Sequence, residues 1–245
     1  MGSTGSTWLA KLLNSHPDVL CSHEEVISRV YPAPEYGQSD ILRYIEALAA
    51  ETAHGAYSAI GDVGSTWMWH VACLPSFTTA VLIRHPARLL HTRLRVFPKD
   101  QSFSWIPPRT AQILREIWGL DLYAYDPIDR IFLNDIVTFA SQVWVMGKVN
   151  IILRIEDMHH LNHCQETLHA LTGVIFPEPL LLNAIRSRVN QRTASSESIA
   201  DVVAGFSSRQ RDWYGKLLAD AGPFFGYSLW DDELTTPPLP STTPR

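Results

Sequence analysis

The sequence lacks any concentration of basic residues. Its 20 lysines and arginines are outnumbered by 25 aspartates and glutamates, which gives a formal net charge of -5 at pH 7. A surface that binds nucleic acid needs clustered lysine and arginine. We therefore expect no nucleic-acid partner, and any site for an anion must be local.

Cysteine is also scarce. The three cysteines, Cys21, Cys73 and Cys164, are odd in number and far apart. This pattern fits free thiols in a reducing compartment better than a disulfide framework or a zinc site. We therefore expect a cytoplasmic protein. We also expect no metal, because the histidines within residues 159–169 have no matching set of carboxylates or thiolates.

Long apolar runs are absent as well. No stretch approaches the roughly 18 apolar residues of a membrane helix, and the first residues lack the charged and apolar regions of a signal peptide. The sequence therefore predicts no association with a membrane.

The glycine-rich stretch at residues 2–8 contains no lysine. A Walker-type nucleotide loop needs lysine and then serine or threonine after its glycines, which disfavours an ATPase or kinase. Gly2 and Gly5 let backbone N–H groups turn toward one point, and the helix expected at residues 7–15 adds the positive end of its dipole. We therefore expect a backbone cradle that binds an anion here, with phosphate as the expected ligand.

Strand-like segments alternate with helix-like segments along the chain. Apolar and β-branched runs predict strands at residues 19–21, 59–62, 78–83 and 149–155. Apolar periodicity predicts helices at residues 7–15, 41–53, 65–74, 109–118, 128–146, 158–171, 180–189, 198–204 and 207–221, and Pro86 predicts the first turn of another. This order indicates an α/β fold whose parallel sheet carries helices on both faces.

We expect one domain over residues 1–234, followed by a disordered tail rich in Pro, Ser and Thr at residues 235–245. Only Met1 precedes the glycine-rich loop, although a phosphate loop normally follows a buried strand. Two interpretations stay open: the chain is an N-terminally shortened form, or its sheet lacks the first strand.

Arg84 follows directly on the clearest buried strand, at residues 78–83. Open α/β sheets bind their ligands at the carboxyl ends of the strands. Arg84 is therefore a candidate for a charge-assisted contact with a phosphate.

Four stretches, in this order, resemble the sulfotransferase family that uses 3′-phosphoadenosine 5′-phosphosulfate (PAPS), most closely its bacterial and tyrosylprotein branches. Residues 3–9 resemble the 5′-phosphosulfate loop, and residues 13–21 with the acidic pair after them resemble the segment that carries a basic carboxylate. Residues 81–86 with Thr92 are similar to the 3′-phosphate motif, and residues 151–157 to a later strand that ends in Glu-Asp. Residues 209–213 resemble a C-terminal stretch of the family more weakly.

The resemblance implies a three-layer α/β/α fold with a P-loop-like phosphosulfate loop. It implies transfer of a sulfuryl group from PAPS to a hydroxyl or amine of a small-molecule or appended acceptor, without a metal. The residues that it assigns to the donor are Ser3, Thr4, Gly5, Ser6, Thr7 and Trp8 in the loop, Arg84 and Thr92 at the 3′-phosphate, and Arg209 and Arg211.

A general base would take the proton of the acceptor as it attacks sulfur. Glu24 is the first candidate, and Glu25, His23 and His70 are alternatives. Adjacent carboxylates in an extended segment point to opposite sides, so only one of Glu24 and Glu25 is expected to face the site.

The loop departs from the family at Ser3, a catalytic position that usually holds lysine or arginine, and Val63 stands where bacterial relatives often have lysine. Loss of the loop cation costs about 2–4 kcal/mol of leaving-group stabilisation if nothing replaces it. A non-catalytic relative that binds a nucleotide or a partner protein is therefore the alternative. The acceptor pocket is expected in the aromatic stretch at residues 98–127.

Overall fold

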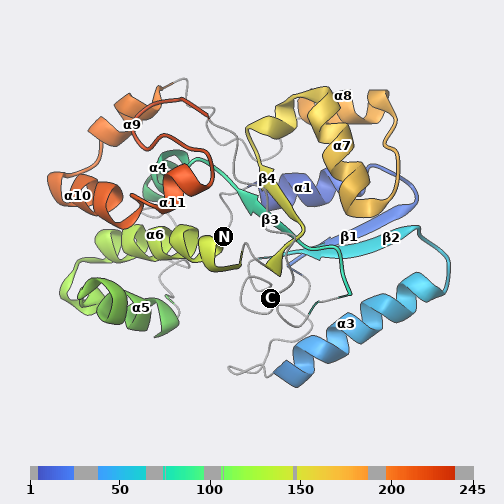
Figure 1. The fold of residues 1–245 in the computed structure, drawn as a ribbon, viewed down its shortest axis with the longest axis horizontal. Coiled ribbons are helices and arrows are strands. Elements are labelled where there is room, and N and C mark those ends of the chain that lie inside the picture. Colours follow the sequence, from blue (N-terminus) through green and yellow to red (C-terminus); the bar gives the residue numbers. More distant parts are fainter. Residues whose placement is uncertain are drawn as a thin grey trace. The chain divides into compact units, whose positions relative to one another are not determined.

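The computed structural model describes residues 5–24, 38–64, 74, 76–96, 106, 108–145, 148–186 and 197–234 (Figure 1). The chain forms two compact units, each built from two separate segments. Unit 1 comprises Met1–Ile83 and Val145–Arg192, and unit 2 comprises Arg84–Trp144 and Thr193–Arg245. The expectation of a single domain over residues 1–234 stays a prediction.

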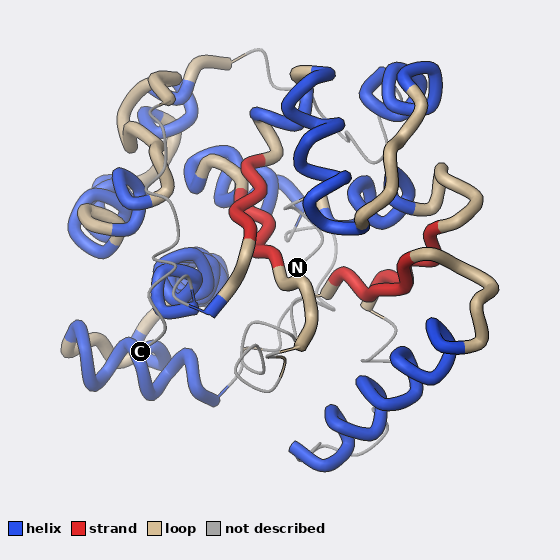
Figure 2. Tube along the Cα trace, turned by 45° about the vertical axis from the view of Figure 1, so that its right-hand side comes forward, coloured by secondary structure: helices blue, strands red, loops and turns tan. Residues whose placement is uncertain are grey.

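Unit 1 holds all the described strands, which are red in Figure 2. They form two parallel pairs, in which Cys21 lies opposite Gly61 and Leu82 lies opposite Leu153. The elements of this unit are α1 (Ser6–Leu13), β1 (Val19–His23), α3 (Gln38–Ala53), β2 (Ala59–Val63), β3 (Ala80–Ile83), β4 (Ile151–Arg154), η7 (Asp157–His159), α7 (Leu161–Thr172) and α8 (Glu178–Arg186).

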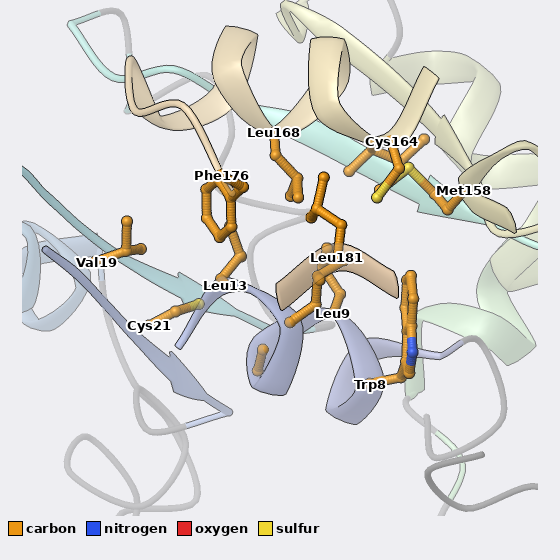
Figure 3. Close-up of a cluster of buried hydrophobic side chains, with 13 residues drawn as sticks. Trp8, Leu9, Leu13, Val19, Cys21, Met158, Cys164, Leu168, Phe176 and Leu181 are labelled. Atoms are coloured by element: carbon orange, nitrogen blue, oxygen red, sulfur yellow. The ribbon is translucent and has the colours of Figure 1, made fainter. Parts of the chain in front are cut away.

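The core of unit 1 is centred on α1, whose apolar face meets side chains from β1, β4, α7 and α8 (Figure 3). Leu12 of α1 and Leu168 of α7 are almost completely buried. Trp8 also lies in this core, and its indole N–H donates to the Ala184 carbonyl of α8 at 3.1 Å. Burial of side chains of this size contributes about 1.5–3 kcal/mol each, so α1 is held firmly in place.

Unit 2 consists of helices in its described part: α4 (Pro86–Val96), α5 (Pro108–Trp118), η5 (Leu122–Ala124), α6 (Pro127–Val145), α9 (Ile199–Ala204), α10 (Ser208–Leu217) and α11 (Ala221–Phe224). Aromatic rings hold these helices together edge to face. Phe132 meets Phe206 with ring centroids 5.1 Å apart, and Phe139 meets Phe225 at 5.4 Å. Such pairs add about 0.5–1.5 kcal/mol beyond the apolar area that they bury.

Most of the predicted elements are confirmed within one to four residues. The strand expected at residues 78–83 begins at Ala80, because the N–H of Thr79 binds the side chain of Asn150. The helix expected at residues 207–221 ends at Leu217, and α11 begins only at Ala221. The helix expected at residues 65–74 and the tail at residues 235–245 lie outside the described residues, apart from Leu74.

The α/β class predicted from the sequence is confirmed, with both described strand pairs parallel. Among the described helices, none combines the length and the apolarity that crossing a membrane requires.

Candidate functional site

The glycine-rich loop ends at Gly5, which directly precedes α1. Gly5 has a left-handed backbone with φ of 91°, and a Cβ placed there would lie 2.8 Å from Cδ1 of Ile155. The positive φ favours glycine at this position, and a larger residue would also displace the terminal methyl of Ile155. The first turn of α1 holds no acidic residue, and Gly5 supplies no side-chain cap. Ser3 and Thr4 lie outside the described residues.

The ring of His23, the last residue of β1, reaches the first turn of α1. Its Nε2 lies 2.9 Å from Oγ of Ser6 and 3.3 Å from Oγ1 of Thr7. The parallel strands β1 and β2 both end here, so the site lies at the carboxyl ends of strands, as open α/β sheets favour. The tertiary structure therefore joins two loop residues to a residue that the sequence offered only as an alternative base.

Glu24 follows β1 in a left-handed conformation with φ of 56°, and no other described residue except glycine has a positive φ. Its N–H donates to the Val63 carbonyl at 3.0 Å, which ties it to the end of β2. A left-handed backbone costs a residue with a Cβ roughly 1–2 kcal/mol, and such strain is concentrated at functional sites. The expectation that Glu24 lies in an extended segment is wrong, and Glu25 and His70 lie outside the described residues.

Asp62 of β2 belongs to the same edge and was missed by the sequence analysis. The Ser22 hydroxyl donates to its Oδ1 at 2.6 Å and lies 3.3 Å from the Tyr44 hydroxyl of α3. A signal was available, because Asp62 ends a short apolar strand just as Arg84 does. Burial, and then the charge of Asp62, raise the pKa of the Cys21 thiol to about 12, so this cysteine is an unreactive core residue.

Arg84 and Thr92 belong to unit 2 and lie before and on α4. Arg84 is half-buried and directly follows β3 in the chain. The Thr92 hydroxyl donates to the Arg88 carbonyl at 2.8 Å, and Arg88 in turn binds Asp232 at 2.8 Å. Arg88 thus forms an ion pair within unit 2. The phosphate-binding role of Arg84 and Thr92 stays a prediction.

Arg209 and Arg211 of α10 have extensive contacts inside unit 2. Arg209 forms an ion pair with the buried Asp129, and its guanidinium lies 5.4 Å from the ring centres of both Tyr125 and Trp213. The Nη1 of Arg211 donates to two carbonyls at the end of α9, those of Ala204 and Phe206. These interactions do not test the predicted contact of Arg209 and Arg211 with the nucleotide, which stays a prediction.

The structure thus brings Ser6 and Thr7, which follow Gly5, to the ring of His23, which Glu24 follows in the chain. The described residues include no group of three His, Cys, Asp or Glu side chains that could hold a metal ion. Comparisons with models of protein families, with curated proteins and with solved structures found no match. Function is therefore inferred from the residues of the site.

Proposed function

We propose that this chain is a sulfotransferase that binds PAPS and transfers its sulfuryl group to a hydroxyl or amine of a small-molecule or appended acceptor. One observation carries the proposal: the start of α1, with the hydroxyls of Ser6 and Thr7, adjoins the carboxyl end of β1, where Glu24 has a strained backbone. Helix N-termini bind anions through free N–H groups and the helix dipole. A carboxylate beside such a cradle is suited to remove a proton from a nucleophile.

The proposed reaction is a direct transfer. The acceptor oxygen or nitrogen forms a bond to sulfur while the bond between sulfur and the 5′-phosphate oxygen breaks. The proton of the acceptor passes to the Glu24 carboxylate, and 3′-phosphoadenosine 5′-phosphate (PAP) leaves with the electron pair. Ser6, Thr7 and the first N–H groups of α1 hold the oxygens of the donor, so catalysis comes from positioning and charge stabilisation.

The same proposal extends to the fold and the compartment. The parallel pairs β1–β2 and β3–β4, with α1 packed into a core that includes residues of both β1 and β4, support a three-layer α/β/α arrangement with a P-loop-like loop. The three scattered cysteines support a cytoplasmic location.

Titration with PAP, the product nucleotide, tests donor binding. We expect binding heat and a rise in melting temperature, because a ligand that binds only the folded state stabilises it by about 2.7 kcal/mol at 100 times its dissociation constant. Adenosine 5′-phosphate, which lacks the 3′-phosphate, should bind more weakly. If PAP gives neither heat nor a melting shift at millimolar concentration, the proposal is wrong.

Arg84→Ala tests the predicted 3′-phosphate contact. Loss of a charge-assisted hydrogen bond of about 1.5–3 kcal/mol should weaken PAP binding roughly 10- to 150-fold and leave adenosine 5′-phosphate nearly unaffected. Arg95→Ala, at an exposed arginine in the last turn of α4, is the matched control and should bind PAP like the wild type. Unchanged PAP affinity in Arg84→Ala would remove Arg84 from the site.

A non-catalytic nucleotide-binding relative is the second candidate, and Ser3 in place of the loop cation favours it. Incubation with PAPS labelled in its sulfuryl group and a panel of hydroxyl and amine acceptors separates the two candidates. Labelled product identifies an enzyme, whereas PAP binding without labelled product supports the binding protein.

A further inference from the structure

The ring of His23 is placed to act on the two loop hydroxyls at once. Its Nε2 lies within hydrogen-bond distance of both Ser6 and Thr7, which are 17 and 16 residues earlier in the chain. The contact joins the end of a strand to the start of a helix. Because α1 is fixed by its buried leucines and β1 by its pairing with β2, neither partner of this contact is on a long flexible arm.

The proton on Nε2 of His23 determines what the two hydroxyls can do, and every imidazolium carries this proton but only one of the two neutral tautomers does. A hydroxyl has one proton to donate, so a Ser6 hydroxyl that donates to an unprotonated Nε2 has none left for an anion. An imidazolium carries a proton on Nε2 and can only donate, which leaves the Ser6 and Thr7 protons for the ligand. It also adds a positive charge beside the first turn of α1. Histidine is the side chain that changes charge in the range of about pH 5–8.

The elements that adjoin His23 carry three described carboxylates, and Asp62 is paired with Ser22 rather than with His23. Glu24 is its neighbour in the chain, Asp62 lies on the paired strand β2, and Glu156 follows Ile155, whose side chain lies against Gly5. Among the described cations of α1 and β4, Lys11 is exposed in the last turn of α1, and Arg154 forms an ion pair with Asp157 at 2.6 Å.

We propose that protonated His23 supplies the positive charge that Ser3 does not. The affinity of the start of α1, with Ser6 and Thr7, for the 5′ end of the sulfuryl donor therefore rises as the pH falls. This regulation rests on the proposed function, because it assumes that the loop binds the donor nucleotide. It makes His23 a positioning residue that acts through Ser6 and Thr7, and leaves Glu24 as the base.

The test is PAP binding by calorimetry at about pH 5.5 and about pH 8, in wild type and in His23→Gln. The phosphates of PAP themselves titrate near pH 6, so the decisive quantity is the ratio of wild-type to variant affinity at each pH. We expect the two affinities to be nearly equal at the higher pH. At the lower pH the wild type should bind PAP at least about fivefold more tightly, because a neutral hydrogen bond becomes charge-assisted.

Two further variants keep the test sharp. His23→Lys carries a permanent charge, so it should bind PAP more tightly than the wild type at about pH 8 by a similar factor. His54→Gln, at an exposed histidine just after α3, is the matched control and should keep the wild-type pH profile. Circular dichroism of each variant verifies the fold.

The outcomes separate the two proposals. If wild type binds PAP and the ratio to His23→Gln is the same at both pH values, the role of His23 is refuted while donor binding stands. If wild type does not bind PAP at either pH, donor binding fails and the inference on His23 fails with it.

Discussion

At the scale of single residues, Asn14 binds the edge of β1 that faces away from β2. The N–H of Glu24 and the carbonyl of Asp18 form hydrogen bonds toward β2. Successive residues of a strand direct their backbone groups to alternate edges, so Cys21, three residues from each, directs its N–H and carbonyl to the other edge. There Oδ1 of Asn14 accepts from the Cys21 N–H at 2.8 Å, and Nδ2 donates to the Cys21 carbonyl. One side-chain amide thus takes the place of a neighbouring strand.

Asn14→Asp should therefore destabilise the protein by about 1–3 kcal/mol, because a carboxylate cannot donate to the Cys21 carbonyl and leaves it unsatisfied. Urea unfolding measures this loss. Lys11→Gln, on the exposed side of the same helix, is the control and should change stability by less than about 0.5 kcal/mol. Equal stability of Asn14→Asp and wild type would show that water replaces the amide.

The strained backbone of Glu24 and its proposed role as the base predict opposite effects of substitution on stability and on turnover. Replacement of Glu24 by glycine relieves the left-handed backbone, so we expect unchanged or slightly higher stability, within about 1 kcal/mol, since glycine also gains entropy in the unfolded chain. Labelled-sulfuryl turnover should fall by about 10²- to 10⁴-fold, the usual contribution of a general base. Glu24→Gln retains the shape of the side chain and should lose turnover equally; a fully active Glu24→Gln would exclude Glu24 as the base.

At the scale of elements, α4 and α6 are joined by a buried ion pair. Nε of Arg93 lies 2.9 Å from Oδ2 of Asp135, and both side chains are almost fully inaccessible. Burial raises the pKa of Asp135 above its ordinary value, and Arg93 opposes that rise. The folded state therefore binds a proton more readily than the unfolded state, so stability decreases as the pH rises from the ordinary pKa of Asp135 to the raised one.

Arg93→Met should accordingly destabilise unit 2 by about 3–5 kcal/mol near neutral pH, because it leaves a buried carboxylate without its cation. The loss should be smaller in acid, where Asp135 accepts a proton and becomes neutral. Urea unfolding at about pH 5 and about pH 7.5 measures both values. The double variant Arg93→Met/Asp135→Leu should recover most of the stability; a double variant as unstable as the single would refute the electrostatic explanation.

At the scale of the whole molecule, each unit is assembled from segments that are far apart in the sequence. A chain that ends at Trp144 would keep β3 and lose its partner β4, together with the core residues Leu153, Met158, Leu168 and Leu181. Each of these contributes about 1.5–3 kcal/mol, and their sum rivals a typical total stability of about 5–15 kcal/mol.

We therefore expect residues 1–144 alone to show no cooperative thermal unfolding by circular dichroism. A chain that ends at Leu234 is the control, and from the composition of residues 235–245 we expect it to unfold like the full chain. A cooperative melt of the 1–144 fragment near the melting temperature of the full chain would contradict this prediction.

The sequence by itself determined the local structure. Unbroken apolar runs predicted β3 and β4, because strands buried on both faces show no alternation. Apolar periodicity and Pro86 predicted α1 and α4, and the glycines before α1 predicted a turn at Gly5 that favours glycine. These features depend on residues within a few positions of one another, so the printed order of residues is enough to find them.

Only the tertiary structure decided which distant residues meet. His23 reaches Ser6 and Thr7 because β1 runs back along α1, and Arg209 meets Asp129 across 80 residues of chain. The left-handed backbone of Glu24 likewise accompanies its bond to Val63 on β2. Hydrogen bonds of this kind depend on the packing that holds the elements in place, and no spacing along the chain encodes them.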